Sequence, residues 1–383
     1  MTVKSLDDIA TPALILDRAR MERNATFMSD RMRDMGVRLR PHLKTAKSAD
    51  VARIATAEHF GGITVSTLAE AQYFAQNGIL DIVYAVALTP QKIDLIDALQ
   101  SEFEAHITAL TDSTEVARTI ADRAPKLANN LSVLMEIDCG GGRAGVTIDD
   151  PDMLEIAKIL HAADNVTFEG VLTHAGQSYH CTSIDEIVTV AEVERDTVVA
   201  AAKALSDVGI PCSTISGGST PTALNAPHFD GVTEMRPGVY VFSDLMQTAL
   251  GWGTHSDIAV SVLATVIGHR RDLGQILIDA GGLALSKDRG MDHIDPSVGM
   301  GLICDKLGQQ EITGLYVDDT HQEHGILRMN DGSEPAYDDL PIGSRVRVLP
   351  VHACMTAAAF DRYQVVADGG DQIVDEWHRA SGW

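Results

Sequence analysis

Eight short apolar runs, rich in β-branched residues, alternate along this chain with longer stretches of helical periodicity. The runs are Val37–Leu43, Gly62–Ser66, Ile82–Ala87, Ala105–Leu110, Leu131–Ile137, Phe168–Thr173, Ser213–Ser216 and Val232–Arg236. Between them, stretches such as Asp149–Ala162 and Ile184–Val208 carry apolar residues at helical spacing. Eight strands with crossover helices are what a (β/α)8 barrel requires. The pattern therefore predicts an α/β fold with an N-terminal TIM-like (β/α)8 barrel over residues 20–248.

An open, doubly wound sheet is the alternative to the barrel. Such sheets usually contain fewer strands, and no GxGxxG motif follows the first predicted strand. The sequence therefore favours the barrel and does not indicate a dinucleotide-binding half.

A second, β-rich domain is predicted over residues 249–383, where long helical stretches become scarce. Its expected strands are separated by Gly, Asp and Pro turns and include Val260–Gly268, Gln275–Ala280, Gly325–Met329 and Ser344–Leu349. We expect the early run Ala13–Leu16, within residues 1–19, to add a strand to this domain.

The composition excludes several classes of function. The 383 residues carry 54 acidic and 30 basic side chains, and the formal net charge of −24 disfavours binding to nucleic acid or to anionic membranes. No apolar run approaches the ~18 residues of a spanning helix, and the first residues contain no signal-like apolar segment. The five cysteines are scattered and form no CxxC pair, which is typical of a reducing compartment. We expect a cytoplasmic protein.

Polar and glycine residues gather after the predicted strands, at the rim where a (β/α)8 barrel carries its active site. Lys44 directly follows the first strand. A lysine there, desolvated and near the cations Arg40 and Lys47, can form a Schiff base with an aldehyde. Arg143 follows three glycines after the fifth strand, in a loop that suits a phenolate or a carboxylate. The plainer interpretations are a solvated lysine and an arginine in a surface ion pair.

The segment after the seventh strand has the composition of a phosphate-binding loop. In the run Ser216-Gly217-Gly218-Ser219-Thr220, glycines let the backbone approach an anion, while N–H and hydroxyl groups supply donors. Gly238-Val239 after the next strand strengthens this prediction, because late strands of such barrels usually hold phosphate. A flexible turn is the plainer alternative.

The second domain contains a pattern that is typical of a metal site. His352 and Cys354 stand two residues apart after a predicted strand, and they can present imidazole and thiolate to one ion. Nitrogen together with soft sulfur suits Zn²⁺ first. The alternative is a buried cysteine beside a structural histidine.

Nine stretches, in order along almost the whole chain, resemble a known family, and the ordered set is more specific than any one of them. The stretches are Thr11–Ala13, Arg40–Thr45, Glu136–Asp138, Gly142–Val146, Thr173–Gly176, Ser216–Thr222, Arg236–Tyr240, Gln322–Gly325 and His352–Cys354. The set resembles the fold-type III pyridoxal 5'-phosphate (PLP) enzymes, the alanine-racemase-like barrels. Within them it is most similar to the metal-activated D-serine dehydratases, D-threo-3-hydroxyaspartate dehydratases and D-threonine aldolases.

The resemblance implies roles for individual residues in holding the cofactor. Lys44 matches the lysine that forms the Schiff base with PLP, and Arg143 matches the arginine at the cofactor's phenolic oxygen. His174 and Tyr179 match positions beside the pyridine ring. The phosphate site is matched by the loop that begins at Ser216, with Gly217, Gly218, Ser219, Gly238 and Val239, and with Tyr240 nearby.

The resemblance also implies a metal, an assembly and a reaction. His352 and Cys354 match the metal ligands of the dehydratases, with zinc expected first and manganese or cobalt as alternatives. A homodimer is expected. Lys44 is expected to act as the base at Cα while the metal assists departure of the β-hydroxyl. The substrate is then D-threo-3-hydroxyaspartate or D-serine, and the products are an oxo acid and ammonia.

Other reactions on the same fold stay open. D-threonine aldolases break Cα–Cβ and release glycine and an aldehyde, but they often carry Asp in place of Cys354 and a third glycine in place of Ser219. Racemases bring a tyrosine from the second domain and need no metal, and no racemase-like tyrosine motif is recognised here. PLP-carrier proteins of this fold lack the second domain. These differences favour a dehydratase.

Overall fold

The computed structural model describes residues 4–57, 59 and 61–383, and it divides into two compact units. The barrel unit contains Phe27–Gly238 and the last two residues of the chain. The β-rich unit contains the chain up to Thr26 together with Val239–Ser381. No helix among the described residues is long and apolar enough to cross a bilayer.

Within the residues described, the barrel unit is built on eight parallel strands, one for each run identified in the sequence. They are β2 (Arg38–Leu39), β3 (Ile63–Val65), β4 (Asp81–Ala87), β5 (His106–Thr111), β6 (Leu131–Glu136), β7 (Val166–Leu172), β8 (Thr214–Gly217) and β9 (Glu234–Met235). From β3 to β9 each strand pairs with the next, and β9 pairs with β2. A bridge between His42 and Thr64 joins the end of β2 to β3 and closes the ring. The predicted TIM-like barrel is confirmed.

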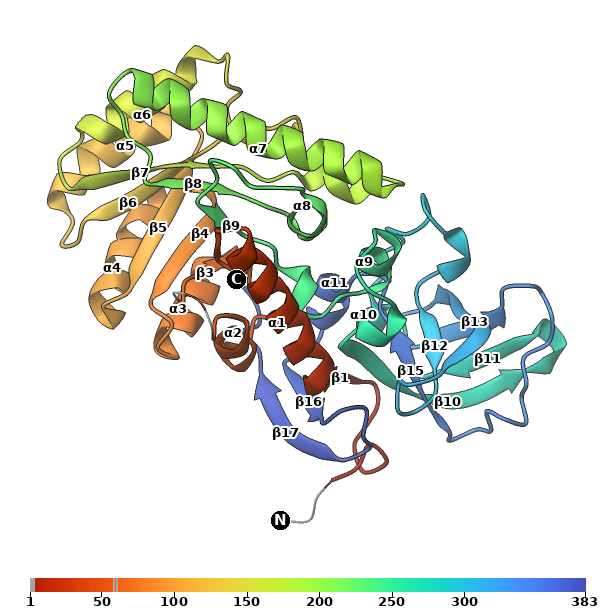
Figure 1. The fold of residues 1–383 in the computed structure, drawn as a ribbon. Helices are drawn as coiled ribbons and strands as arrows, with labels where there is room; N and C mark the ends of the chain where they lie inside the picture. Colours follow the sequence, from red (N-terminus) through yellow and green to blue (C-terminus); the bar gives the residue numbers. More distant parts are fainter. Residues whose placement is uncertain (1–3, 58, 60) are drawn as a thin grey trace. The chain divides into compact units, whose positions relative to one another are not determined.

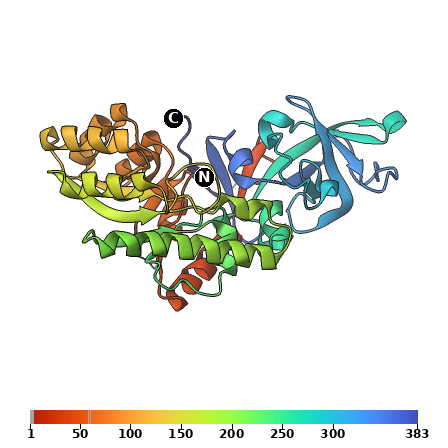
Figure 2. The ribbon, with the colours of Figure 1, turned by 90° about the horizontal axis from the view of Figure 1, so that it is seen from above.

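Helices connect the barrel strands, and α4 to α7 lie along the outer side of the sheet (Figure 1, and from above in Figure 2). The side chains of Thr67, Ser113 and Ser183 are N-caps: they accept hydrogen bonds from backbone N–H groups in the first turns of α3, α5 and α7. The helices α6 and α7 confirm the two helical stretches predicted from periodicity. The full set is α1 (Arg18–Asp34), α2 (Ala49–Ala55), α3 (Leu68–Gln76), α4 (Ile93–Phe103), α5 (Thr114–Arg123), α6 (Pro151–Ala162), α7 (Ile184–Asp207) and α8 (Thr220–Asn225).

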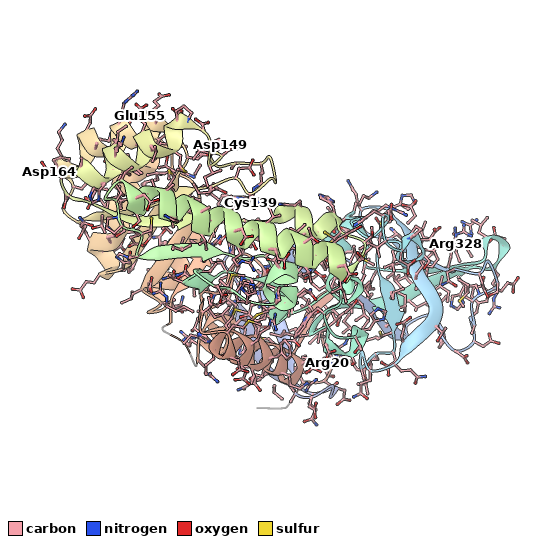
Figure 3. The ribbon with its side chains drawn as sticks, turned by 45° about the horizontal axis from the view of Figure 1, so that its top comes forward. Arg20, Cys139, Asp149, Glu155, Asp164 and Arg328 are labelled. Carbon is pink, nitrogen blue, oxygen red and sulfur yellow. The ribbon has the colours of Figure 1, made fainter. Side chains whose placement is uncertain are left out.

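The barrel has an apolar centre, and acidic side chains stand in and around its outer helix α6. One residue from each of four neighbouring strands forms a buried cluster: Val83, Leu110, Leu134 and Leu172. Figure 3 labels Asp149, Glu155 and Asp164 in and around the outer helix α6. Asp149 and Asp164 are exposed to water, while the strands pack on apolar side chains.

In the described part of the β-rich unit, nine strands form one sheet. They are β1 (Ala13–Asp17), β10 (Val260–Arg270), β11 (Gln275–Ile278), β12 (Leu302–Cys304), β13 (Glu311–Thr320), β14 (Gly325–Met329), β15 (Arg345–Leu349), β16 (Arg362–Val366) and β17 (Ile373–His378). The sheet order is β11-β14-β13-β12-β15-β10-β1-β16-β17. Because β10 also pairs with β11, strands β10 to β15 close into an antiparallel barrel. The prediction of a β-rich second part of the fold is confirmed.

The early strand β1 confirms the expectation for Ala13–Leu16. It pairs antiparallel with β10 and parallel with β16, and Ile15 packs in a buried cluster with Leu6, Leu263 and Val366. Four strands, β12, β13, β16 and β17, were not identified from the sequence. Two of them carry several acidic residues and one has three residues, so their alternation of apolar and polar positions is weak.

Candidate active site

The carboxyl ends of the barrel strands surround a cavity of about 340 Å³. Its wall includes the apolar Ala85–Ala87 of β4 and Leu172 of β7. Its polar lining consists of His42, Lys44, Ser66, Glu136, Arg143, His174 and Arg236. Three of these side chains are cationic and one is a carboxylate, although the whole chain has a net charge of −24. The cavity therefore suits an anionic ligand with an apolar portion.

Lys44 is exposed at this cavity, and the ring closure of the barrel holds the segment before it. The His42 N–H donates to the Pro237 carbonyl at 2.9 Å. The Leu43 N–H donates to the Thr64 carbonyl at 2.8 Å. Backbone hydrogen bonds to both neighbouring strand ends therefore set where the lysine emerges.

The two cations expected near the active lysine are engaged in ion pairs. Arg40 is buried, and its guanidinium lies 2.7 Å from a carboxylate oxygen of Asp81 and of Glu234. The Lys47 ammonium lies 3.1 Å from the buried Glu70 carboxylate. Carboxylates compensate both charges, and the lysine itself is exposed in this chain, so the predicted desolvated setting is wrong.

Arg143 and Arg236 are the cations that share the cavity with the lysine. The Arg143 guanidinium is largely exposed and lies 3.6 Å from the buried Glu136 carboxylate at the end of β6. Burial raises the pKa of Glu136, and the Arg143 charge opposes that shift. Arg236 is buried, and burial lowers its pKa while the carboxylates of Glu234 and Glu194 act in the opposite direction. The cavity is therefore cationic on balance.

Asp138 shapes the glycine loop that carries Arg143. Its carboxylate accepts the N–H groups of Gly140 at 2.9 Å, Gly141 at 2.8 Å and Gly142 at 3.2 Å. Gly140 and Gly142 have φ values of 97° and 62°, which favour glycine. A side chain therefore organises this loop from within, a role that the sequence analysis missed.

The two histidines of the cavity are neutral at physiological pH. Burial lowers the pKa of His174 to about 3, and the charges of Lys44 and Arg143 add to this shift. Burial, followed by the Lys44 charge, also lowers the pKa of His42 well below its ordinary value. Nδ1 of His174 lies 3.3 Å from the Gly218 carbonyl, to which a neutral ring donates, and this leaves Nε2 as an acceptor.

The predicted phosphate loop forms a hydrogen-bonded turn at the start of α8. The Gly218 N–H donates to Glu194 Oε1 at 3.0 Å, and the Ser219 N–H donates to the Thr222 hydroxyl at 2.9 Å. The Ser219 hydroxyl in turn caps α8. The N–H groups of Gly218 and Ser219, which were expected to bind an anion, thus donate to protein side chains instead. Binding of phosphate by this loop stays a prediction.

Glu194 of α7 is a buried residue that the sequence analysis missed. Its Oε1 accepts the N–H groups of Ala175 at 2.8 Å and of Gly218 at 3.0 Å, which ties the end of β7 to the end of β8. Burial raises the pKa of Glu194. It stands in a helix with many acidic residues, so the sequence holds no signal that distinguishes it.

Three other residues of the predicted phosphate site, Ser216, Gly217 and Gly238, contribute to the strands and to the closure of the barrel. Ser216 is buried in β8, and its hydroxyl donates to Glu234 at 2.8 Å. Gly217 is the last residue of β8. A Cβ at Gly238 would lie 2.6 Å from the His42 carbonyl oxygen, so the closing of the barrel requires glycine there.

Three further predicted residues lie in short turns. Tyr179 is half-buried in a 3₁₀ turn at Gly176–His180 of the barrel unit. Val239 and Tyr240 open another such turn, Val239–Val241, directly after the last barrel segment, and they belong to the β-rich unit. Burial raises the pKa of Tyr240.

His352 and Cys354 lie together in the β-rich unit, at the start of α11 (Ala353–Ala357). Nδ1 of His352 lies 2.8 Å from Asp288 Oδ2. Burial opposes the charged imidazole, but hydrogen bonds with Asp288 and Cys354 raise the pKa of His352 to about 11. Over the residues described, no group of three or more His, Cys, Asp or Glu side chains could hold a metal ion. The pair therefore offers two protein ligands.

The neutral state of His174 predicts how stability depends on pH. Its pKa is about 3 in the folded chain and about 6.5 when unfolded, so its contribution is present above pH 6.5 and is lost as pH falls toward 3. The variant His174→Gln should reduce the loss of unfolding free energy between pH 7 and 5.5 by roughly 1 kcal/mol. Urea unfolding at both pH values measures this difference. The exposed His161→Gln should behave as the wild type, and an unchanged pH dependence in His174→Gln would contradict the assignment.

The profiles of two protein families together match most of the chain. The alanine racemase N-terminal domain matches residues 16–245, and a putative serine dehydratase domain matches residues 259–366. The first match covers the barrel strands and the second covers strands β10 to β16, so the two halves of the fold follow one another as in the resemblance described above.

Relatives that match almost the whole chain include dehydratases and aldolases. D-threo-3-hydroxyaspartate dehydratase of Delftia sp. (strain HT23) is 44% identical, covering 100% of this chain and 99% of the relative. Its solved structure has a TM-score of 0.95 at 43% identity, covering 99% of this chain and 100% of that one. A cysteine-to-alanine mutant of a D-threo-3-hydroxyaspartate dehydratase has been solved in a metal-free form, with the same TM-score of 0.95.

Two more distant relatives also cover the whole chain. D-serine dehydratase of Dictyostelium discoideum is 31% identical, over 99% of this chain and 98% of the relative. D-threonine aldolase from Filomicrobium marinum has a TM-score of 0.83 at 25% identity, covering 99% of this chain and 98% of that one. The chain belongs to the alanine-racemase-like family whose members join the racemase-type barrel to a D-serine dehydratase domain.

Proposed function

We propose that this protein is a PLP- and divalent-metal-dependent lyase that removes water from a D-β-hydroxy amino acid to give an oxo acid and ammonia. D-threo-3-hydroxyaspartate is the first candidate substrate and D-serine is the second. The observation that carries the proposal is the contact of His352 with Cys354 and Asp288, in a chain that is 44% identical to a D-threo-3-hydroxyaspartate dehydratase along its whole length.

The side chains of the barrel cavity fit PLP. Lys44 supplies an amine, Arg143 and Arg236 supply positive charge for anionic groups, and Val86 and Leu172 supply an apolar wall. We assign Lys44 to the cofactor's aldehyde carbon and Arg143 to its phenolic oxygen. The other proposed cofactor contacts are His174, Tyr179, Ser216, Gly217, Gly218, Ser219, Gly238, Val239 and Tyr240.

The donor set of the β-rich unit fits a divalent ion. Imidazole nitrogen and thiolate sulfur are ligands that zinc prefers, so we propose Zn²⁺ ahead of Mn²⁺ or Co²⁺. His352 and Cys354 would both bind in their deprotonated forms, and the ion therefore displaces their protons. Two protein ligands leave coordination positions open for a substrate.

The cofactor, the metal ion and the side chains of the protein have separate roles in the proposed reaction. When bound, PLP withdraws electrons from Cα and the metal ion acts as a Lewis acid toward the departing hydroxyl. Lys44 Nζ removes the proton from the substrate Cα as the general base. His42 and His174 stay neutral beside this amine and add no repulsive charge to it. The Glu136 carboxylate balances the guanidinium that holds the cofactor's oxygen.

Retro-aldol cleavage is the second candidate reaction, because a D-threonine aldolase shares the fold along the whole chain. In that reaction a base removes the proton of the β-hydroxyl, the Cα–Cβ bond breaks, and glycine and an aldehyde leave. The thiol at Cys354 supports the dehydratase, since the aldolases of this family often carry a carboxylate there.

We further propose that the enzyme works on its small-molecule substrate as a cytoplasmic homodimer. The proposed domains are residues 20–248 for PLP and residues 249–383 for the metal, with a strand contributed from residues 1–19. The pairing of β1 with β10 and β16 supports that contribution. Sedimentation at micromolar concentration tests the dimer.

Product analysis tests the proposed reaction. The full-length protein, loaded with PLP and Zn²⁺, should convert D-threo-3-hydroxyaspartate into equal amounts of ammonia and oxo acid, with D-serine as the slower substrate. D-threonine, offered in parallel, should give neither glycine nor acetaldehyde. Glycine and an aldehyde as main products would overturn the dehydratase and establish the aldolase.

The role of Lys44 predicts a spectroscopic result. PLP bound through the lysine amine absorbs in the visible range, so Lys44→Ala should lose this band and lower turnover on the order of 10²-fold to 10⁴-fold. Lys203→Ala is the control, because that exposed amine is paired with the likewise exposed carboxylate of Asp207. It should keep both the band and the activity. A band retained in Lys44→Ala would exclude the lysine as the attachment point.

The internal hydrogen bonds of Asp138 predict a defect in cofactor affinity. Asp138→Ala releases three N–H groups and loosens the loop of Arg143, so the Kd for PLP should rise about tenfold. Asp138→Asn keeps an acceptor oxygen and should stay close to the wild type. Fluorescence titration with PLP measures the affinities. Asp150→Ala, which removes a carboxylate cap from α6, serves as the control. Equal affinities for both alanine variants would contradict the loop assignment.

A further inference from the structure

Two carboxylates from separate segments converge on the three residues His352, Ala353 and Cys354. The first is Asp288, which follows α10 (Gly282–Leu285), and its Oδ2 lies 2.8 Å from His352 Nδ1. Its side chain is one-quarter exposed. The Asp288 carboxylate also accepts the N–H of Gly290 at 2.8 Å, so the loop that carries it is fixed as well.

The second carboxylate, Asp244, is completely buried. Its Oδ1 accepts the Gln247 N–H at 2.9 Å and so caps α9 (Leu245–Ala249). Its Oδ2 accepts the Ala353 N–H at 2.9 Å. Each oxygen of Asp244 therefore has its own backbone donor, and one of these donors is the peptide between the two predicted metal ligands.

These contacts restrict the two ligands in different ways. Asp288 accepts a hydrogen bond from Nδ1 of His352, which sets the rotation of the ring and leaves Nε2 as the nitrogen that can bind a metal ion. Asp244 holds the backbone between the ligands, from which both side chains project. Leu285 adds support, because its carbonyl accepts the Thr356 hydroxyl at 2.9 Å and fixes α11.

We propose that Asp288 and Asp244 are positioning residues of the metal site, Asp288 by orienting the His352 ring and Asp244 by fixing the peptide between His352 and Cys354. This inference rests on the proposed function, which makes these two side chains metal ligands. Carboxylates that orient a ligating histidine commonly contribute 10-fold to 100-fold in metal affinity. The two aspartates therefore determine how strongly the site holds its ion.

Metal affinity of the full-length, metal-stripped protein tests the proposal directly. Zn²⁺ is titrated in competition with a chromophoric chelator. Asp288→Ala should raise the Kd for Zn²⁺ by about 10-fold to 100-fold. Asp288→Asn keeps an oxygen that accepts from Nδ1 and should lie between Asp288→Ala and the wild type. Asp292→Ala is the control from the same loop, because it breaks only an exposed ion pair with Arg289, and it should leave the Kd unchanged.

Two further measurements separate positioning from a general structural role. Excess Zn²⁺ should restore the turnover of Asp288→Ala to within a few-fold of the wild type, which it would not do for a misfolded protein. Co²⁺ in place of Zn²⁺ should show a changed visible spectrum in Asp288→Ala and in Asp244→Asn, because the ligands are held differently. Thermal unfolding of the metal-free proteins shows whether Asp244→Asn folds; Asp288→Ala decides the test if it does not.

The possible outcomes distinguish the inference from the proposed function. A wild-type Kd and Co²⁺ spectrum in Asp288→Ala would overturn the inference while metal-dependent activity of the wild type still stands. A wild-type protein that binds no Zn²⁺, or binds it equally well after Cys354→Ala, would overturn the metal site itself. Weakened binding in Asp288→Ala with unchanged binding in Asp292→Ala supports both.

Discussion

The backbone pairing that closes the barrel is the contact on which the cavity depends. The segment after β2 bonds to Thr64 of β3 on one side and to Pro237 on the other, and Lys44 emerges directly after it. This closure also explains Gly238, because a Cβ there would lie 2.6 Å from the His42 carbonyl oxygen. The position of Lys44 at the cavity and the glycine at position 238 are thus consequences of one closed ring.

Carboxylates that accept hydrogen bonds from backbone N–H groups are a second recurring feature of this structure. Asp138 organises the loop of the cavity arginine, and Glu194 ties the ends of β7 and β8 together. Asp244 and Asp288 act on the histidine and cysteine of the β-rich unit. An acidic chain therefore uses some of its buried negative charge to fix loops, while the side chains lining the barrel cavity stay cationic on balance.

Local patterns predicted the architecture well and the electrostatics of the site poorly. All eight barrel runs became strands because apolar β-branched residues between helices have few other arrangements. The expected cations Arg40 and Lys47 are instead neutralised by carboxylates of other strands and helices. Glu194 and Asp288 stayed unnoticed, because an acidic residue in a helix or loop of an acidic chain carries no distinguishing signal.

The sequence by itself determined the alternation of strands and helices, the β-rich second part, and the motifs that contain Lys44, His352 and Cys354. These features depend on the spacing of residues within short segments, and a local sequence pattern is enough to recognise them. Only the tertiary structure decided which charges remain in the barrel cavity, and which carboxylates hold the loop of Arg143 and the His352–Cys354 segment. The reason is distance along the chain: Arg40 meets Glu234 across 194 residues and His352 meets Asp288 across 64, and no local pattern encodes such contacts.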